Sequence, residues 1–275
     1  MLVTCNVCMH HCKLENGQIG RCHARKNEQD KIMSINYGKL TSLALDPIEK
    51  KPLARFYPKS FILSVGSFGC NLRCPFCQNF GISMATEKDV STKFVAPRQL
   101  AEQALELTKH GNIGVAFTYN EPLVGYEYVI DTAKILQELG LKTVVVTNGS
   151  VTEEIAGKVL PYIDAVNIDL KGFTDKYYEK LGGDLATVKK FIKLAASQCH
   201  VELTTLIIPG ENDTKEEMLA LATWIAQVDK EIPLHVSRFF PSYNMVNTEP
   251  TPIAQIYALT NVAKKKLLYV YTGNC

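Results

Sequence analysis

Seven short apolar runs, separated by segments with a helical pattern, fill the sequence from residue 61 onward. Each run is rich in Val, Ile, Thr or aromatic residues, as expected for strands that are buried on both faces. A strand followed by a helix, repeated along the chain, predicts parallel strands that are joined by right-handed crossovers. The predicted strands span residues 61–67, 113–118, 141–147, 164–170, 201–208, 234–240 and 267–271.

The helices between these strands have recognisable first residues. Pro97 is expected at the first helical position, where a missing backbone N–H costs nothing. Asp213 is the expected N-cap of a later helix, because acidic residues follow it in the first turn. Trp224 lies on the apolar face of that helix and is expected in the core. Cys199 is isolated from the other cysteines and is expected to pack as a small hydrophobic residue.

Two parallel architectures fit this alternation, an open doubly wound sheet and a barrel. No G-x-G-x-x-G follows any predicted strand, so the dinucleotide-binding form of the open sheet loses its main support. Unusual turns follow the strands instead, among them YNEP at 119–122 and NGS at 148–150. Barrel enzymes gather their active-site residues at the carboxyl ends of the strands, so these turns favour a barrel.

The composition is that of an ordinary globular protein. Of the 275 residues, 46% are hydrophobic, which is enough to bury a large core. No apolar run approaches the roughly 20 residues of a membrane span, and the N-terminus lacks a signal-peptide pattern, so we expect a cytoplasmic protein without a membrane partner. The net charge of +2 is too small to indicate a nucleic-acid partner. In a reducing compartment the nine cysteines are expected to be metal ligands or catalytic thiols.

Four segments of the chain differ in their pattern. The first is rich in Cys and His with little apolar periodicity, and the second contains several prolines. The predicted division is a Cys-rich metal-binding knuckle at 1–30, a connecting segment at 31–59, a partial barrel at 60–245, and a C-terminal helix and strand at 246–275.

Three cysteines stand close together directly after the first predicted strand. Cys70, Cys74 and Cys77 have the spacing C-x3-C-x2-C, which chance alone would rarely produce. Three thiolates can hold zinc with one open position, or three irons of a [4Fe–4S] cluster whose fourth iron is free. Both arrangements leave a metal position available for chemistry.

The octapeptide CNLRCPFC, residues 70–77, resembles the motif of the radical S-adenosylmethionine (SAM) superfamily. The resemblance implies a partial parallel (β/α)6-type barrel that binds a [4Fe–4S] cluster and SAM. It also implies an external electron donor of the flavodoxin or ferredoxin type. In that family an electron from the cluster splits SAM into methionine and a 5′-deoxyadenosyl radical, which abstracts a hydrogen atom from the substrate. Phe76 fills a position that is usually aromatic in the family and packs near the adenine.

The turns after the next strands extend the resemblance. TYNEP at 118–122 occupies the place of a family turn that binds the methionine amino group, which implies that role for Glu121 and for the carbonyls of Tyr119 and Asn120. TNGS at 147–150 resembles the segment that contacts the SAM ribose and carboxylate, which implies contacts for Thr147 and Asn148.

Four further polar residues follow or lie within later strands. Asp169 is expected to bind a ribose hydroxyl or a cation, and Lys171 the SAM carboxylate or an anionic substrate; a plain Asp–Lys surface pair is the alternative. His235 and Arg238 would grip a carboxylate or peptide carbonyl of the substrate if their strand faces the barrel interior. A structural role is the alternative for His235.

A finer resemblance concerns the subclass. The N-terminal CNVCMHHCKLENGQIGRCHAR, together with TYNEP, DLKGF and LHVSRFFPSYNM, is similar to the radical SAM member of the AmmeMemoRadiSam system, a relative of the pyruvate formate-lyase activating enzymes. The substrate is then a protein or a small molecule. A glycyl-radical-enzyme activase is the first alternative, and a non-catalytic iron–sulfur or zinc platform is the second. Val146 stands where the activases carry Asp, so their monovalent-cation site does not carry over whole.

Four more cysteines precede the barrel. Cys5, Cys8, Cys12 and Cys22 are spaced C-x2-C-x3-C-x9-C in a segment that has few apolar residues to fold around. Four thiolates suit structural zinc or a second iron–sulfur cluster. We expect zinc, because a closed four-ligand site would mainly contribute to folding.

Overall fold

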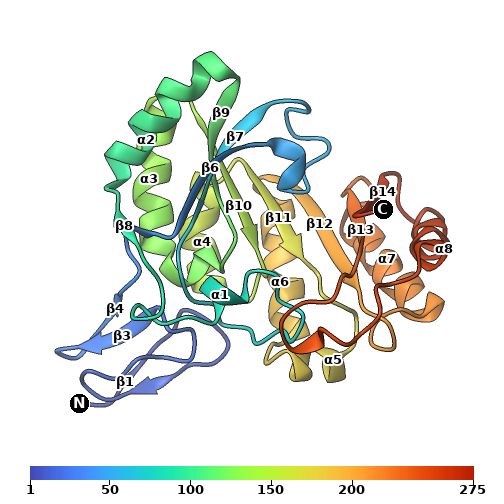
Figure 1. The fold of residues 1–275 in the computed structure, drawn as a ribbon, viewed down its shortest axis with the longest axis horizontal. Helices are drawn as coiled ribbons and strands as arrows, with labels where there is room; N and C mark the ends of the chain where they lie inside the picture. Colours follow the sequence, from blue (N-terminus) through green and yellow to red (C-terminus); the bar gives the residue numbers. More distant parts are fainter.

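An eight-stranded sheet forms the centre of the computed structural model, which describes residues 1–275 (Figure 1). Its strands are β6 (Ser42–Pro47), β7 (Phe61–Gly66), β9 (Asn112–Phe117), β10 (Lys142–Thr147), β11 (Ala165–Asp169), β12 (His200–Ile207), β13 (Leu234–Arg238) and β14 (Val270–Gly273). They lie in the order β14-β13-β12-β11-β10-β9-β7-β6. Neighbours from β7 to β14 are parallel, and β6 alone is antiparallel. The edge strands β6 and β14 do not pair, which confirms the predicted partial barrel.

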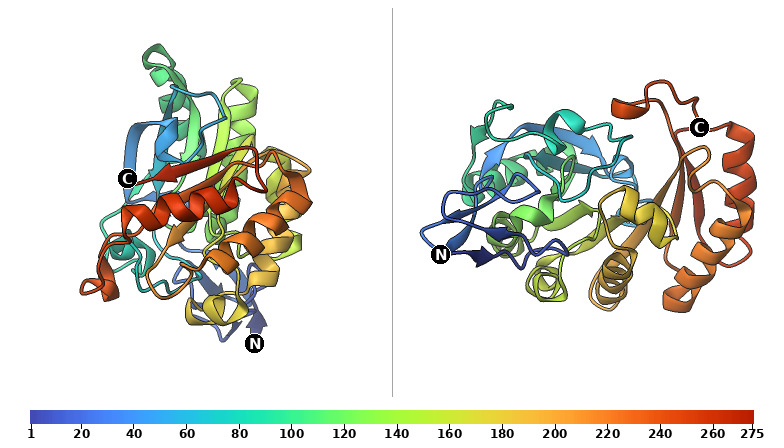
Figure 2. Two further views of the ribbon diagram at one scale, coloured as in Figure 1. Left: turned by 90° about the vertical axis from the view of Figure 1, so that its right-hand side faces the viewer. Right: turned by 90° about the horizontal axis from the view of Figure 1, so that it is seen from below.

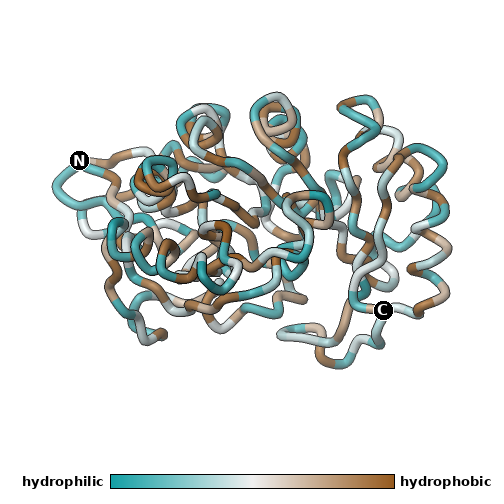
Figure 3. Tube along the Cα trace, turned by 90° about the horizontal axis from the view of Figure 1, so that it is seen from above, coloured by the Kyte–Doolittle hydropathy of each residue, from teal (hydrophilic) through white to brown (hydrophobic).

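The larger helices cover one side of this curved sheet, as the two further views show (Figure 2). They are α2 (Pro97–Glu106), α3 (Tyr126–Glu138), α4 (Glu153–Val159), α6 (Leu185–Ala196), α7 (Lys215–Asp229) and α8 (Ile253–Ala263). Two short helices, α1 (Phe80–Ser83) and α5 (Asp175–Lys180), lie in the loops after β7 and β11. Hydrophobic residues follow the strands and recur along the helices, where one core joins the two layers (Figure 3). No helix is both long enough and apolar enough to cross a membrane.

Several predicted details differ from the structure. The last strand begins at Val270 rather than at residue 267, because Leu267 packs into the core as the chain leaves α8. Thr214, not Asp213, is the N-cap of α7, and its hydroxyl accepts the Glu217 N–H at 3.2 Å. Asp213 accepts a hydrogen bond from Gln255 instead, at 2.9 Å.

Other details agree with the sequence pattern. Pro97 is the first residue of α2. Trp224 is buried in the main core. Cys199 lies just beyond the end of α6, where its thiol donates to the Ala195 carbonyl at 3.6 Å and its side chain packs against the same core.

Small hairpins make up the N-terminal segment. β1 (Val3–Thr4) pairs with β2 (Lys13–Leu14), and β3 (Arg25–Glu28) pairs with β4 (Lys31–Ser34). The predicted boundary between residues 30 and 31 therefore falls inside a hairpin. The predicted connecting segment also supplies β6 to the sheet, and β5 (Lys39–Leu40) pairs with β8 (Lys93–Phe94).

The segment between β6 and β7 crosses the amino ends of the parallel strands. Ile48, Leu53 and Phe56 pack there in a small core of their own with residues of four strands. The fully buried carboxylate of Glu202 on β12 accepts the backbone N–H groups of Ala54 at 2.9 Å and Arg55 at 2.7 Å. This end of the barrel is thereby closed, and the other end is left for the site.

Candidate active site

The cysteine loop leaves the carboxyl end of β7. The Cys74 side chain is buried, and those of Cys70 and Cys77 are half-buried. The Leu72 backbone N–H donates to the Cys70 sulfur at 3.4 Å. Gly69 adopts φ +91°, and a Cβ there would stand 2.4 Å from the Cys22 carbonyl oxygen, so only glycine allows this close approach to the N-terminal segment.

Asn120 fastens this loop to the end of β9. Its side-chain oxygen accepts the Ser67 N–H at 2.9 Å, and its amide donates to the carbonyls of Phe68 at 3.2 Å and Gly69 at 3.0 Å. The preceding Tyr119 has φ +73°, which is uncommon outside glycine and is typical of functional turns. The Asn120 side chain is therefore occupied by the loop, and its N–H donates to the Thr118 carbonyl at 3.0 Å, so only its backbone carbonyl is free for a cofactor.

Glu121 is a buried carboxylate, 2% exposed, next to this loop. It accepts hydrogen bonds from Leu123 N at 3.0 Å, Thr147 Oγ1 at 2.7 Å and Asn148 N at 2.7 Å. A carboxylate has about four acceptor positions, so one remains for an external donor. Burial raises the pKa of Glu121 to about 7, although these donors oppose the rise. A cationic ligand would restore its negative charge.

Thr147 and Asn148 have most of their polar atoms engaged within the protein. The Thr147 hydroxyl also accepts the Gly149 N–H at 3.0 Å. The Asn148 amide lies 3.6 Å from the Cys70 sulfur and donates to Asn71 Oδ1 at 2.9 Å. Both residues therefore connect Glu121 to the cysteine loop, a function that the sequence pattern did not predict.

Asp169 and Lys171 form an ion pair at the end of β11, with Oδ2 and Nζ 2.7 Å apart. The Lys171 side chain is only 15% exposed, so this is not a plain surface pair. Burial lowers the pKa of Lys171, but Asp169 and the thiols of Cys74 and Cys77 outweigh it, and the net shift is upward. The ammonium therefore stays charged beside the cysteine loop.

A cavity of about 370 Å³ lies between these loops, a volume within the range of small-molecule sites. Polar and apolar groups from the ends of several parallel strands surround it. Its lining includes the predicted residues Cys70, Cys74, Cys77, Phe76, Tyr119, Asn120, Glu121, Thr147, Asn148, Asp169 and Lys171.

His235 and Arg238 do not line this cavity. His235 lies toward the amino ends of the strands, where its Nε2 is 2.6 Å from Glu202 Oε2 and its ring stacks on Tyr271. Arg238 points to the other face of β13, where its Nε donates to the Thr251 carbonyl at 2.7 Å. Side chains alternate along a strand, and the three-residue separation puts the two on opposite faces. The predicted substrate contacts of both residues are not supported.

The chemistry of the loop fits a [4Fe–4S] cluster. Three reduced cysteine thiols can bind three of its irons and leave the fourth iron open. The Tyr177 hydroxyl is buried without a hydrogen-bond partner and packs in the small core around Cys74 and Phe76. A cluster sulfur or a ligand thiolate would give this hydroxyl an acceptor. Tyr177 could not be recognised from the sequence, because a Tyr inside a helical segment belongs to no motif.

The sequence itself matches a known family. The family model of the Radical SAM superfamily matches residues 64–222, from β7 into α7. The chain belongs to the radical SAM superfamily. An uncharacterized protein of Methanocaldococcus jannaschii is 38% identical over 275 residues, which cover 99% of this chain and 81% of that protein. The pyruvate formate-lyase-activating enzyme of Clostridium pasteurianum is 28% identical over 163 residues, 58% of this chain and 67% of the enzyme.

Solved structures of radical SAM proteins share the fold. A domain of pyruvate-formate lyase-activating enzyme from Bacteroides vulgatus has a TM-score of 0.51 at 18% identity, covering 58% of this chain and 98% of that one. Streptococcus suis SuiB bound to S-adenosylmethionine has a TM-score of 0.61 at 15% identity, covering 78% of this chain and 52% of that one. The family implies SAM and a [4Fe–4S] cluster as cofactors, and the cavity beside the three cysteines fits both.

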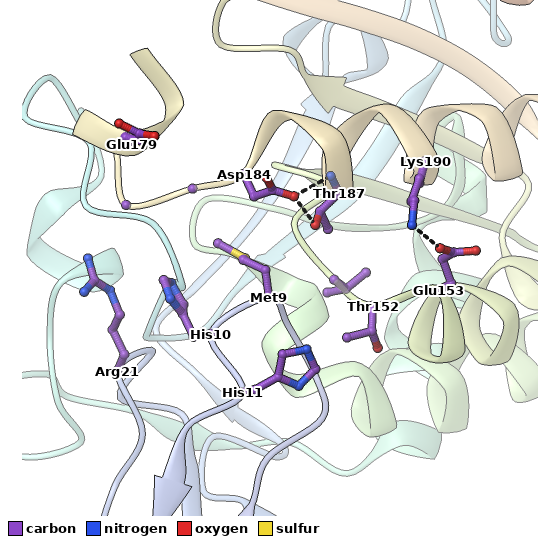
Figure 4. Close-up of a pocket in the computed structure, with 13 residues that line it drawn as sticks. Met9, His10, His11, Arg21, Thr152, Glu153, Glu179, Asp184, Thr187 and Lys190 are labelled. Atoms are coloured by element: carbon purple, nitrogen blue, oxygen red, sulfur yellow. Dashed lines mark hydrogen bonds and ion pairs between the residues drawn. The ribbon is translucent and has the colours of Figure 1, made fainter. Parts of the chain in front are cut away.

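A second, larger hollow of about 800 Å³ lies outside this site, between the N-terminal segment and the first turns of α4 and α6 (Figure 4). Its polar groups are partly paired with each other: Lys190 Nζ lies 2.8 Å from Glu153 Oε1, and Asp184 caps α6 by accepting from Thr187 N at 2.7 Å. Among its lining residues His10 touches the cysteine loop, with Nε2 2.8 Å from the Asn71 carbonyl oxygen. Only two of its 13 lining residues are hydrophobic, compared with nine of 24 in the cavity at the cysteines.

Proposed function

We propose that this radical SAM protein cleaves SAM reductively and uses the 5′-deoxyadenosyl radical to abstract a hydrogen atom from a protein substrate, as an enzyme of the AmmeMemoRadiSam type. The observation that carries the proposal is the cavity that joins three cysteine thiols to a buried carboxylate with one acceptor position left. When bound, the [4Fe–4S] cluster supplies the electron that breaks a carbon–sulfur bond of SAM.

The residues around the cavity would divide the recognition of SAM among them. The free acceptor position of Glu121 would take the methionine ammonium, together with the backbone carbonyl of Asn120. The Tyr119 carbonyl already accepts hydrogen bonds from Asn79 Nδ2 at 2.9 Å and Ser83 Oγ at 3.4 Å. Thr147 and Asn148 would orient Glu121. An ammonium left without such partners in a buried pocket would be costly, so Glu121 would hold the amino acid part of SAM in place.

The opposite side of the cavity would hold the rest of the cofactor. Phe76 is buried against the cysteine loop and borders the cavity, where its ring would pack near the adenine. Asp169 could accept a ribose hydroxyl while it pairs with Lys171, and Lys171 would attract the SAM carboxylate or an anionic group of the substrate.

The electron would come from an external donor of the flavodoxin or ferredoxin class. Cleavage of each SAM consumes one electron, and no strand of this chain is followed by the G-x-G-x-x-G turn of a dinucleotide site. A protein substrate is favoured because two similar proteins are named as activating enzymes, one for pyruvate formate-lyase and one, putatively assigned, for a glycyl-radical enzyme.

These similarities also favour a second candidate function, the activation of a glycyl radical enzyme. In that case the hydrogen atom would be taken from a backbone glycine of the partner. Val146, where the activases carry Asp, sets this chain apart from them. A gene for a glycyl radical enzyme next to the gene of this protein would favour this candidate over the first.

Anaerobic turnover tests both candidates and the non-catalytic platform. The protein is reconstituted with iron and sulfide, reduced, and supplied with SAM and candidate partner proteins. Mass spectrometry is expected to find 5′-deoxyadenosine and a modified partner. The absence of 5′-deoxyadenosine from a preparation with a full, SAM-responsive cluster would reject the enzymatic proposal in favour of a binding platform.

Glu121→Gln is expected to weaken SAM binding about tenfold or more, since hydrogen bonds to charged groups contribute about 1.5–3 kcal/mol. Calorimetry on the reconstituted protein measures the affinity, and the iron content should not change. Glu217→Gln is the matched control, because Glu217 also accepts a backbone N–H, from Phe173 at 2.6 Å, but does not line the cavity. Equal SAM affinity in wild type and Glu121→Gln would disprove the ammonium contact.

A further inference from the structure

We infer that Cys5, Cys8, Cys12 and Cys22 hold a second iron–sulfur cluster, directly beside the loop of the catalytic cluster. Zinc, which the sequence analysis favoured at these residues, is the alternative that the experiment below distinguishes. Three observations support it: the four thiols share one region, a buried guanidinium there lacks a full set of partners, and the segment contacts the catalytic loop.

The hairpins of the N-terminal segment gather the four cysteines. The pairing of β1 with β2 places Cys5 opposite Cys12, and the Cys5 N–H donates to the Cys12 carbonyl at 2.9 Å. The Cys12 sulfur lies 3.7 Å from the point where a Cβ at Gly20 would stand, two residues before Cys22. Cys5, Cys8 and Cys22 are each at most 7% exposed, and none of the four cysteines forms a disulfide. Four reduced thiols thus share one small region.

Arg25 adds a buried positive group to the same region. Its side chain is 2% exposed, and its two terminal nitrogens bind the Glu127 carboxylate at 2.6 and 2.7 Å. The Nε–H remains buried without an acceptor. The Arg25 carbonyl accepts the Gly20 N–H at 2.8 Å, beside the Cys12 sulfur. A metal-bound thiolate or a cluster sulfide would provide the missing acceptor.

Four thiolates could also bind zinc, but zinc does not change its oxidation state and would mainly stabilise the fold. These cysteines lie against the catalytic loop, where the cleavage of SAM under the proposed function consumes an electron, and this position favours a centre that can carry electrons. Four cysteines complete the ligand set of a closed iron–sulfur cluster, with no iron left open for SAM.

The two cysteine groups are in direct contact. The Cys70 N–H donates to the Cys22 carbonyl at 3.1 Å, and His10 reaches the Asn71 carbonyl oxygen at 2.8 Å. The Thr152 N–H donates to the Val7 carbonyl at 3.1 Å and fixes the segment to the loop after β10. A cluster at the N-terminal cysteines would therefore stand against the catalytic loop.

The test counts metals in the full chain after anaerobic purification. Wild type is expected to contain no zinc and about eight irons, or about six if the second cluster is [2Fe–2S], with matching sulfide. The variant with Ala at Cys70, Cys74 and Cys77 should keep the second cluster, visible as a reducible iron–sulfur signal in electron paramagnetic resonance that does not respond to SAM. This signal does not depend on SAM cleavage, so the inference can fail while the proposed function stands.

A second variant addresses the N-terminal cysteines themselves. Ala at Cys5, Cys8, Cys12 and Cys22 should remove two to four irons, while Cys199→Ala, a control at a cysteine outside both groups, should remove none. Zinc in the wild type at about one atom per chain would overturn the inference. So would only four irons in the wild type, or a catalytic-loop variant that contains no iron. If the four-cysteine variant fails to fold, the catalytic-loop variant alone decides.

Discussion

Replacing Cys70, Cys74 and Cys77 together by Ala is expected to abolish formation of 5′-deoxyadenosine completely. The three thiols are the only cysteines that line the cavity with Glu121, so no other group could hold the catalytic cluster next to SAM. Anaerobic assays with mass spectrometry measure the nucleoside product. Electron paramagnetic resonance of the reduced protein should at the same time lose the signal that changes when SAM is added.

Cys199→Ala is the matched control for this triple variant, because Cys199 packs against the main core and does not line the cavity. It should retain the SAM-responsive signal at wild-type intensity. A triple variant that still shows this signal would refute the assignment of the catalytic cluster. Circular dichroism distinguishes loss of the cluster from loss of the fold.

Glu202→Ala is expected to destabilise the protein by about 3–5 kcal/mol, the cost of leaving buried partners without their charge. The carboxylate accepts four donors: the Ala54 and Arg55 N–H groups, and the rings of His200 at 2.9 Å and His235 at 2.6 Å. Its removal would free the segment that closes the amino end of the barrel. Chemical denaturation measures the change in the free energy of unfolding.

The same carboxylate gives the stability a dependence on pH. Burial raises the pKa of Glu202, but its four donors outweigh burial and lower the pKa to about 2. Ionised Glu202 stabilises the folded protein fully above the ordinary Glu pKa of about 4.3, and this stabilisation is lost as the pH falls toward 2. The difference in the free energy of unfolding between wild type and Glu202→Ala should therefore shrink as the pH falls across this interval.

Glu216→Ala is the control, at an exposed position in the first turn of α7. It should change the free energy of unfolding by only tenths of a kcal/mol. A loss of less than about 1 kcal/mol in Glu202→Ala would contradict the role of Glu202.

Much of the site could be predicted from the sequence because its motifs lie within single loops, where the spacing of residues along the chain fixes which side chains are neighbours. The C-x3-C-x2-C run belongs to one loop, and the turns at 118–122, 147–150 and 168–172 each follow a parallel strand. Parallel strands deliver their following loops to one end of the sheet, so these turns had to meet. The lining of the cavity follows from these two facts.

The roles of individual side chains depended on contacts across the chain. The strand that contains His235 and Arg238 has a sequence that suggested substrate contacts. Their polar atoms bind instead to Glu202 and Thr251, which belong to other segments of the chain. The orphan hydroxyl of Tyr177 and the free Nε–H of Arg25 carry no sequence signal at all, because only a folded environment makes a polar atom buried and unpaired.

The sequence by itself determined the strand-and-helix alternation, the catalytic cysteine loop and the family, since each depends on residue types at short and regular spacing. The tertiary structure alone decided that Glu121 keeps one free acceptor position, that β6 joins the sheet as an antiparallel edge, and that Cys22 touches the loop of Cys70. These features arise from hydrogen bonds between segments far apart along the chain. Such bonds form only after packing has brought their partners together, because a buried polar group must find its acceptor wherever the fold provides one.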